Sequence, residues 1–185
     1  MPLVAKQEQL PVAAARAGQP AAWDTLFRRY QLPLYSYVQE LTRHEQTSLD
    51  NVQESFIKAV RHIGSLREDT RFGSWLFGIA HQLCQRRWRK PHHADSLEEI
   101  PEADLATDAE NPAEHLVAVE ERELFFAAID GLPEEHRSVV LLHYLEEFDL
   151  AEIADITGVP LGTVKSRLHT ARRKLRQQLA PEFKS

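Results

Sequence analysis

The sequence predicts an all-α protein made of two small helical domains joined by a flexible acidic linker. Apolar residues recur at three-to-four spacing in both halves of the chain, and the alternating apolar pattern of strands is not seen. Pro91, Pro101 and Pro112 bracket an acidic stretch with little periodicity. The 185 residues, 43% hydrophobic and 27% charged, suit a folded chain. We expect a tail, a first helical domain, a linker and a second helical domain at residues 1–19, 20–90, 91–112 and 113–180.

Three helices are expected in the first domain. The first contains Pro33, which is expected to kink it, and its apolar face comprises Trp23, Leu26, Phe27, Tyr30, Leu34, Val38 and Leu41. The second opens at Thr47 or Ser48, and its predicted inward residues are Leu49, Val52, Phe56, Val60 and Ile63. After a polar loop at residues 64–71, a third helix from about 72 to 90 ends in the basic residues Arg86, Arg87, Arg89 and Lys90.

The second domain ends in the spacing of a helix-turn-helix. A helix at about 113–130 is stopped by Gly131, and Pro133 begins another at about 133–146. Counted from Leu150, a small residue falls fifth, a glycine ninth and an apolar residue fifteenth, at Ala154, Gly158 and Val164. Asp149 and Glu152 form a capping pair that starts the first helix of the motif, and the second is expected at about 163–178.

Basic residues are segregated along a chain whose net charge is −6. Five Arg and Lys residues and no acid lie between Thr70 and Ala94, whereas eleven acids and one base lie between Asp95 and Glu123. Six further basic residues and no acid lie between Ile156 and Pro181. Basic segments on an acidic chain indicate two faces for a polyanion, separated by a segment that DNA would repel. A solvated charged helix face is the alternative for the last segment.

The outward face of the last helix predicts contacts with duplex DNA. In a recognition helix, residues of the first turn reach base edges, and later Lys and Arg residues tend to meet phosphate oxygens. We therefore expect base contacts from Thr163, Ser166 and Arg167, and phosphate contacts from Lys165, Arg172 and Arg173, with Thr170 on the same face.

Membrane insertion, metal binding and catalysis are not expected. No apolar run approaches the roughly 18 residues of a membrane span, and the first residues lack the apolar core of a signal peptide, so we expect a cytoplasmic protein. Nine histidines raise the alternative of a metal sensor or an enzyme, especially His81 with Cys84 and the pair His92 and His93. Because Cys84 falls on an apolar face and H-E-x-x-H is absent, we predict no metal, cofactor or catalytic residue.

Two parts of the chain resemble one protein family. Residues 132–179, with LPEEHRSVV at the start and GTVKSRLHTARRKL near the end, closely resemble region 4 of bacterial sigma factors of the extracytoplasmic-function (ECF) class, within the sigma-70 family. Upstream, WDTLFRRYQLPLYSYV, DNVQESFIKAV and RFGSWLFGIAHQLCQRRWRK resemble region 2 of the same class, in the same order. The likeness covers about residues 20–90 and 113–179.

The resemblance implies an alternative sigma factor that binds core RNA polymerase and gives it promoter specificity. Region 4 would read the −35 element and contact the β flap, and region 2 would bind and open the −10 element. Asp50, Gln53 and Glu54 match the family's DLVQE motif, which docks on the β′ coiled coil. A solvated acidic helix face is the alternative for these three residues. The resemblance also implies control by an anti-sigma factor and an acidic linker that threads through polymerase channels.

Aromatic and basic groups near the third helix suit an unpaired strand independently of the family. The loop from Ser65 to Phe72 lies where the family captures a base flipped out of the −10 element. The expected strand contacts are Ser65, Arg67, Arg71, Phe72, Trp75, Gln82, Arg86 and Arg87. At helical spacing, Phe72 and Trp75 also suit a core.

The chain departs from the family pattern in two helices. Gln82 and Arg86 stand where the family usually shows an asparagine and an aspartate, and Asn51 replaces the leucine of DLVQE. Altered hydrogen-bonding groups on the third helix would read different bases. A helix-turn-helix regulator that is not a polymerase subunit is the alternative function, although the first half lacks the alternating strands and helices of a receiver domain.

Overall fold

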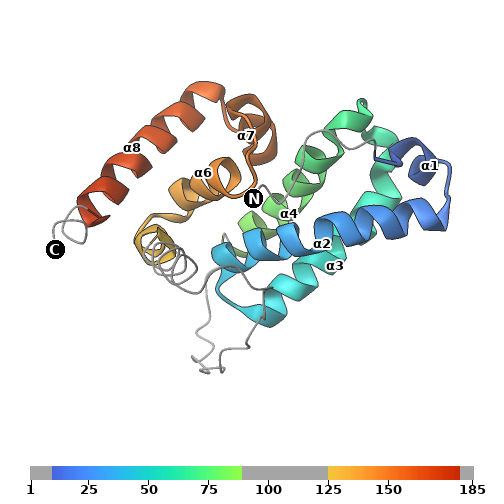
Figure 1. Ribbon diagram of the computed structural model, residues 1–185, viewed down its shortest axis with the longest axis horizontal. Helices are drawn as coiled ribbons and strands as arrows, with labels where there is room; N and C mark the ends of the chain where they lie inside the picture. The colour runs from blue at the N-terminus through green and yellow to red at the C-terminus, as the bar shows by residue number, and fades with distance from the viewer. Residues whose placement is uncertain (1–9, 89–124, 180–185) are drawn as a thin grey trace, which may run out of the picture.

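The computed structural model describes residues 10–88 and 125–179, and within those ranges the regular elements are all helical, as the sequence predicts. Figure 1 shows them as two groups of helices lying against each other. The elements are α1 (Val12–Arg16), α2 (Pro20–Thr42), α3 (Glu45–His62), the short 3₁₀ turns η1 (Ile63–Ser65) and η2 (Asp69–Arg71), α4 (Phe72–Trp88), α6 (Glu134–Tyr144), α7 (Leu150–Thr157) and α8 (Leu161–Leu179). Residues 125–130 are also helical.

The core of the first group lies between α2, α3 and α4. Pro20 occupies the first turn of α2, where its missing N–H costs nothing, and the helix continues through Pro33. Fully buried aromatic side chains fill the centre, and Tyr37 of α2 lies 5.4 Å from Phe77 of α4 between ring centroids. Burying side chains of this size supplies the main favourable free energy of folding.

The buried face of α3 differs from the predicted one. Val52, Phe56 and Ile63 are buried as expected, but Leu49 and Val60 are 47% and 52% exposed. Three polar residues of α3 are buried instead, namely Ser48, Asn51 and Ser55. Each of them makes a hydrogen bond in its buried position, which offsets the loss of hydration. The Asn51 Nδ2 atom donates to the Ala80 carbonyl at 3.3 Å and to Cys84 Sγ at 3.2 Å, so this side chain joins α3 to α4.

Part of the expected N-terminal tail is structured. Residues 12–16 form α1, which buries Val12 and Ala15, and the indole N–H of Trp23 donates to the Ala15 carbonyl at 3.0 Å. The Arg16 guanidinium donates to the carbonyl of Leu66 at 3.1 Å and pairs with Asp69 at 2.7 Å. The segment therefore holds the loop before α4 in place.

The second group contains the predicted helix-turn-helix. The Asp149 side chain accepts hydrogen bonds from the backbone N–H groups of Ala151 and Glu152, and Glu152 accepts one from the Asp149 N–H, which confirms the capping box of α7. Gly158 ends α7 with φ of 69°, a left-handed conformation that glycine adopts without steric cost. The second helix, α8, begins at Leu161, slightly earlier than expected.

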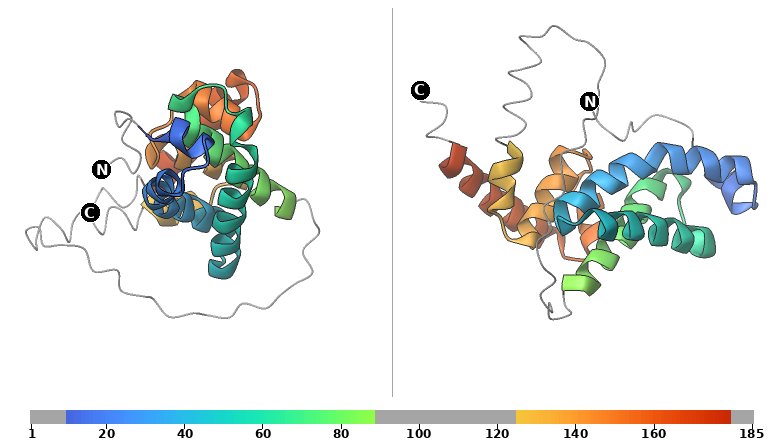
Figure 2. Two further views of the ribbon diagram at one scale, coloured as in Figure 1. Left: turned by 90° about the vertical axis from the view of Figure 1, so that its right-hand side faces the viewer. Right: turned by 90° about the horizontal axis from the view of Figure 1, so that it is seen from below.

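The two groups pack directly on each other, which the sequence did not indicate. The α6 and α7 helices lie beside α2 and α4, and Figure 2 shows the same arrangement from two further directions. The Phe148 ring meets Phe77 edge-on at 5.1 Å, and a Cβ built on Gly78 would lie 3.8 Å from the Ile156 Cα, so α4 and α7 approach closely. None of the described helices is both long and apolar enough to span a bilayer.

Candidate nucleic-acid interface

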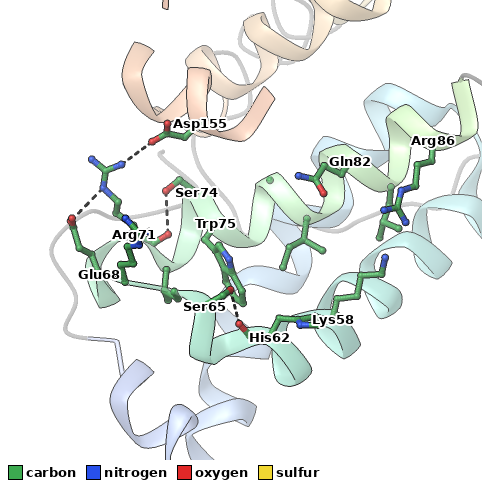
Figure 3. Close-up of a pocket in the computed structure, with 15 residues that line it drawn as sticks. Lys58, His62, Ser65, Glu68, Arg71, Ser74, Trp75, Gln82, Arg86 and Asp155 are labelled. Atoms are coloured by element: carbon green, nitrogen blue, oxygen red, sulfur yellow. Dashed lines mark hydrogen bonds and ion pairs between the residues drawn. The ribbon is translucent and has the colours of Figure 1, made fainter. Parts of the chain in front are cut away.

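A cavity of about 700 Å³ opens between α3, the loop that follows it, and α4. Six of the eight predicted strand-contacting residues line it: Ser65, Arg67, Arg71, Trp75, Gln82 and Arg86. Figure 3 shows these side chains around the hollow, with all but Arg67 labelled. A half-buried indole beside several guanidinium groups provides a surface for stacking a base and cations for a phosphate backbone.

Polar contacts fix the floor and one end of the cavity. The Ser65 hydroxyl donates to the His62 carbonyl at 2.8 Å, which leaves its oxygen lone pairs as acceptors. The Arg71 guanidinium pairs with Asp155 of α7 at 2.8 Å and with Glu68 at 3.4 Å (Figure 3). Asp155 also lines the cavity, so the second group of helices covers one end of it.

The other two predicted strand contacts, Phe72 and Arg87, are not among the described residues that line the cavity. Phe72 is fully buried between Trp23 and Tyr30, so its ring belongs to the core and is not a stacking surface. The helical spacing of Phe72 favoured this alternative, a place in the core. Arg87 belongs to α4, but its side chain lies outside the described residues, as do Arg89 and Lys90 altogether.

Other residues reach the cavity that the sequence did not single out. Lys58 and His62 line it from α3, and Ser74 lines it from α4. Neither Lys58 nor His62 was among the predicted strand contacts. One signal in the sequence was that Lys58 lies one turn before His62, which puts both residues on the side of α3 that leads into the loop.

The outward face of α8 carries the predicted duplex-contacting residues. Lys165, Ser166, Arg172 and Arg173 are exposed, and Thr163 and Thr170 are half-buried. Two of the arginines are held by α6: Arg172 donates to the Tyr144 hydroxyl at 2.7 Å, and Arg167 pairs with Glu135. Arg167 is 19% exposed and shares a small hollow with His81 and Gln85 of α4, so the first group of helices covers part of it.

Exposed acids and apolar side chains lie together on α3. Asp50, Gln53 and Glu54 are all exposed, as predicted. Asp50 accepts a hydrogen bond from Gln46 at 2.9 Å, and Glu54 pairs with Lys58 at 3.2 Å. Three apolar residues of the same helix are also exposed: Leu49, and two turns further on Ile57 and Val60. Solvent-facing apolar side chains beside acids are typical of a protein-binding surface.

Within residues 10–88 and 125–179, no three His, Cys, Asp or Glu side chains are grouped closely enough to hold a metal ion. His81 instead bonds through Nδ1 to the Tyr37 hydroxyl at 2.8 Å and through Nε2 to Gln85 at 2.9 Å. Burial, together with the nearby charge of Arg167, lowers the pKa of His81 to about 4. His92 and His93 lie outside the described residues.

Comparison with known proteins places both groups of helices in one family. The family described as Sigma-70 region 2 matches residues 26–93, and the family described as Sigma-70, region 4 matches residues 122–175. The ECF RNA polymerase sigma-E factor of Haemophilus influenzae is 33% identical over 184 residues, covering 94% of this chain and 96% of the relative. The chain belongs to the ECF class of the sigma-70 family.

Other relatives of this sigma factor agree with the assignment. The RNA polymerase sigma-H factor of Pseudomonas aeruginosa is 31% identical and covers 97% of each chain, and the ECF sigma-E factor of Escherichia coli K12 is 31% identical over 94% of this chain and 95% of its own. Because both regions match in order, a helix-turn-helix regulator that acts outside the polymerase is not favoured. Sigma factors act in transcription initiation.

Solved structures share the fold of this sigma factor. CnrH in complex with the cytosolic domain of CnrY aligns with a TM-score of 0.65 at 21% identity, covering 92% of this chain and 95% of the other. The sigma factor RpoE in complex with the anti-sigma factor NepR from Bartonella quintana aligns with a TM-score of 0.63 at 21% identity, covering 84% and 96%. The cavity thus lies in region 2, and α6 to α8 lie in region 4.

Proposed function

We propose that this sigma factor joins core RNA polymerase, directs it to promoters through −35 and −10 contacts, and opens the DNA. The proposal is supported chiefly by one observation: this sigma-70 chain carries two different surfaces suited to nucleic acid. One is a cavity with an indole and arginines, suited to an unpaired strand, and the other is the outward face of a helix-turn-helix.

In region 2, the cavity would take a base that has left the duplex. Unstacking a base costs a few kcal/mol, which contacts inside a pocket must offset. Trp75 offers a surface for stacking, and Arg67 and Arg86 offer charges for the backbone on either side. Gln82, which carries both a donor and an acceptor, is the residue we propose to sense base identity.

In region 4, the first turns of α8 would enter the major groove at the −35 element. Thr163, Ser166 and Arg167 lie nearest the turn and would reach base edges, while Lys165, Arg172 and Arg173 would meet phosphates, with Thr170 beside them. The pairing of Arg172 with Tyr144 holds its guanidinium in place, which reduces the entropy lost when a phosphate binds.

The α3 surface of Asp50, Gln53 and Glu54 would dock on the β′ coiled coil of core polymerase, and region 4 would contact the β flap. The exposed Leu49, Ile57 and Val60 support this proposal, because apolar side chains supply affinity and the adjacent acids supply specificity. An anti-sigma factor is a further proposed partner, since both solved relatives with this fold were captured in complexes, one of them with a protein named as an anti-sigma factor.

We propose region 2 at residues 20–90, extended by α1 into the 1–19 segment, a linker at 91–112 and region 4 at 113–180. The linker residues fall outside the described part of the chain. Their acidic composition suits a basic channel of the polymerase, and threading through that channel is the role proposed for them.

We expect the protein alone to bind promoter duplex weakly and the complex with core polymerase to bind it tightly and selectively. In the free protein, region 4 covers one end of the region 2 cavity through Asp155, and region 2 covers part of Arg167. Fluorescence anisotropy of a labelled promoter, with and without core enzyme, measures the difference. Equal affinity with and without core enzyme would contradict the proposal.

Two arginines of α8 are expected to behave differently when replaced by alanine. In the complex with core enzyme, Arg167→Ala should cost about 1 to 3 kcal/mol and relax preference at one or two base pairs, because a base-edge contact is lost. Arg173→Ala should weaken all sequences alike and lower the slope of log affinity against log salt by about one unit. Binding titrations over a set of −35 variants separate the two, and uniform losses for both would show that the division is wrong.

A further inference from the structure

The turn between α6 and α7 inserts a carboxylic acid into the junction between regions 2 and 4. Glu146 is 1% exposed, and neither of its oxygens has a hydrogen-bond partner among the described residues. Glu147, next to it, has φ of 53° and is exposed, whereas Phe148 on its other side is buried against Phe77 of α4. The left-handed conformation of Glu147 turns the chain, so that Glu146 and Phe148 on either side of it both point into the junction.

An unpartnered buried carboxylate is tolerated only as the neutral acid. If Glu146 were ionised, closing the two regions would remove its hydration and give it no hydrogen bond in return, which costs a large free energy. If Glu146 is protonated, closing the regions costs only the free energy of burying a neutral polar group. When the regions separate, Glu146 enters water and ionises freely at neutral pH. The packed arrangement therefore holds a proton that the separated arrangement releases.

The groups facing Glu146 do not supply a compensating charge. Tyr37 of α2 lies close enough for mutual electrostatic influence, and burial followed by Cys84 and Glu146 raises the pKa of Tyr37 well above its usual value, so it stays neutral. His81 and Cys84 of α4 also lie at this junction, close to Tyr37. The charged residues between α2 and α6 bond to one another or to carbonyl oxygens: Arg43 to Glu40 and Asp130, and Arg137 to the carbonyls of Glu40 and Asp130. Arg71 pairs with Asp155 between α4 and α7.

We propose that Glu146 is a proton-dependent latch that holds regions 2 and 4 of the free protein together and releases them as pH rises through the neutral range. The latch goes beyond promoter recognition, but its consequence rests on the proposed function. Release removes Asp155 from the region 2 cavity and uncovers Arg167, so both proposed DNA surfaces become available together.

The pH window follows from two opposing groups. Burial raises the pKa of Glu146 from 4.5 to about 8, so its stabilisation of the closed form is complete below pH 4.5 and lost as pH rises through 8. His81 works in the other direction: burial lowers its pKa from 6.5 to about 4, so closing expels a proton from it between those values. The two effects oppose each other below pH 6.5. Above pH 6.5, of these two groups only Glu146 still titrates, and its effect should lower the closure constant by up to tenfold per pH unit.

Energy transfer between two fluorophores on the full chain tests the latch without polymerase or DNA. Exposed Gln31 on α2 and Gln177 on α8 are replaced by cysteine for labelling, in a Cys84→Ser background. Between pH 6.5 and 8 we expect the closure constant of the parent protein to fall by about fifteenfold, because the titration of Glu146 in the closed form levels off near pH 8. Glu146→Gln should stay closed across this range, since a neutral amide has no proton to lose, and Glu147→Gln, the exposed neighbour, should follow the parent.

Circular dichroism verifies that each variant is folded. If Glu146→Gln proves unfolded, Glu146→Leu takes its place, because an apolar side chain of similar size also lacks the charge. A parent protein whose energy transfer is constant from pH 6.5 to 8 would overturn the latch, as would a Glu146 variant that opens along the parent curve. A failure to bind core polymerase would instead count against the proposed function and leave this measurement unaffected.

Discussion

Reversing Asp50 and Glu54 to lysine is expected to abolish binding of the sigma factor to core RNA polymerase. Both side chains are exposed on α3 beside the apolar residues Leu49 and Ile57. Like charges brought together in an interface cost several kcal/mol, so we expect the affinity to fall more than about 100-fold. Co-purification and a fluorescence titration with core enzyme measure the loss.

The fold should survive this substitution. Among the described residues, the polar partners of Asp50 and Glu54 are Gln46 and Lys58 on the same helix, and exposed contacts of this kind contribute a few tenths of a kcal/mol. Asp24→Lys with Glu147→Lys is the matched control, because it makes the same change in net charge at exposed acids away from α3. The docking assignment is wrong if the reversed α3 variant binds core enzyme as the control does.

Removing two arginines from the region 2 cavity is expected to block strand opening while core binding and −35 contact remain. Arg67 and Arg86 line the cavity from the loop and from α4. Alanine at both positions removes two charged contacts to the unpaired strand at about 1 kcal/mol each, which lowers the open fraction roughly thirtyfold. Point substitutions are preferable to shortening the loop, because Leu66 and Phe72 at its ends are buried in the core.

Permanganate reactivity of unpaired thymines measures opening on two templates. On linear duplex the Arg67→Ala, Arg86→Ala variant should leave the −10 region closed. A template already mismatched there should largely recover transcription, because the cost of unpairing has been removed. Arg28→Ala with Arg61→Ala, two exposed arginines that do not line the cavity, is the control and should open both templates. Full opening of the duplex by the cavity variant would refute the assigned role.

Local signals in the sequence predicted the helix-turn-helix in detail. The capping pair Asp149 and Glu152 and the glycine at 158 act through contacts between near neighbours, so their identity and spacing determine the geometry. The α4 residues Trp75 and Arg86 of the cavity were predicted from the grouping of aromatic and basic side chains near that helix, whereas the loop residues were assigned through the resemblance to region 2 of the family.

Contacts between distant segments were not predictable from the same signals. Hydrophobic spacing placed Leu49 and Val60 inward, but Asn51 is buried instead and bonds to Ala80 and Cys84 of α4. Ser55 is buried beside it and bonds to Asn51 within α3. Asn51 was one of three departures from the family pattern, and its hydrogen bonds to Ala80 and Cys84 of α4 give it a structural role. The packing of Phe148 and Glu146 against region 2 depends on surfaces separated by more than fifty residues, which no local pattern encodes.

Transcription in vitro with core polymerase and a library of genomic fragments shows whether the protein gives the polymerase promoter specificity. We expect that adding this protein to core enzyme yields transcripts from a limited set of fragments that share −35 and −10 sequences. We also expect that core enzyme alone, or with the Asp50→Lys, Glu54→Lys variant, yields none of them. Transcripts that are the same with and without the protein, or that start without a shared upstream sequence, would contradict the claim that it is a promoter-specifying subunit of RNA polymerase.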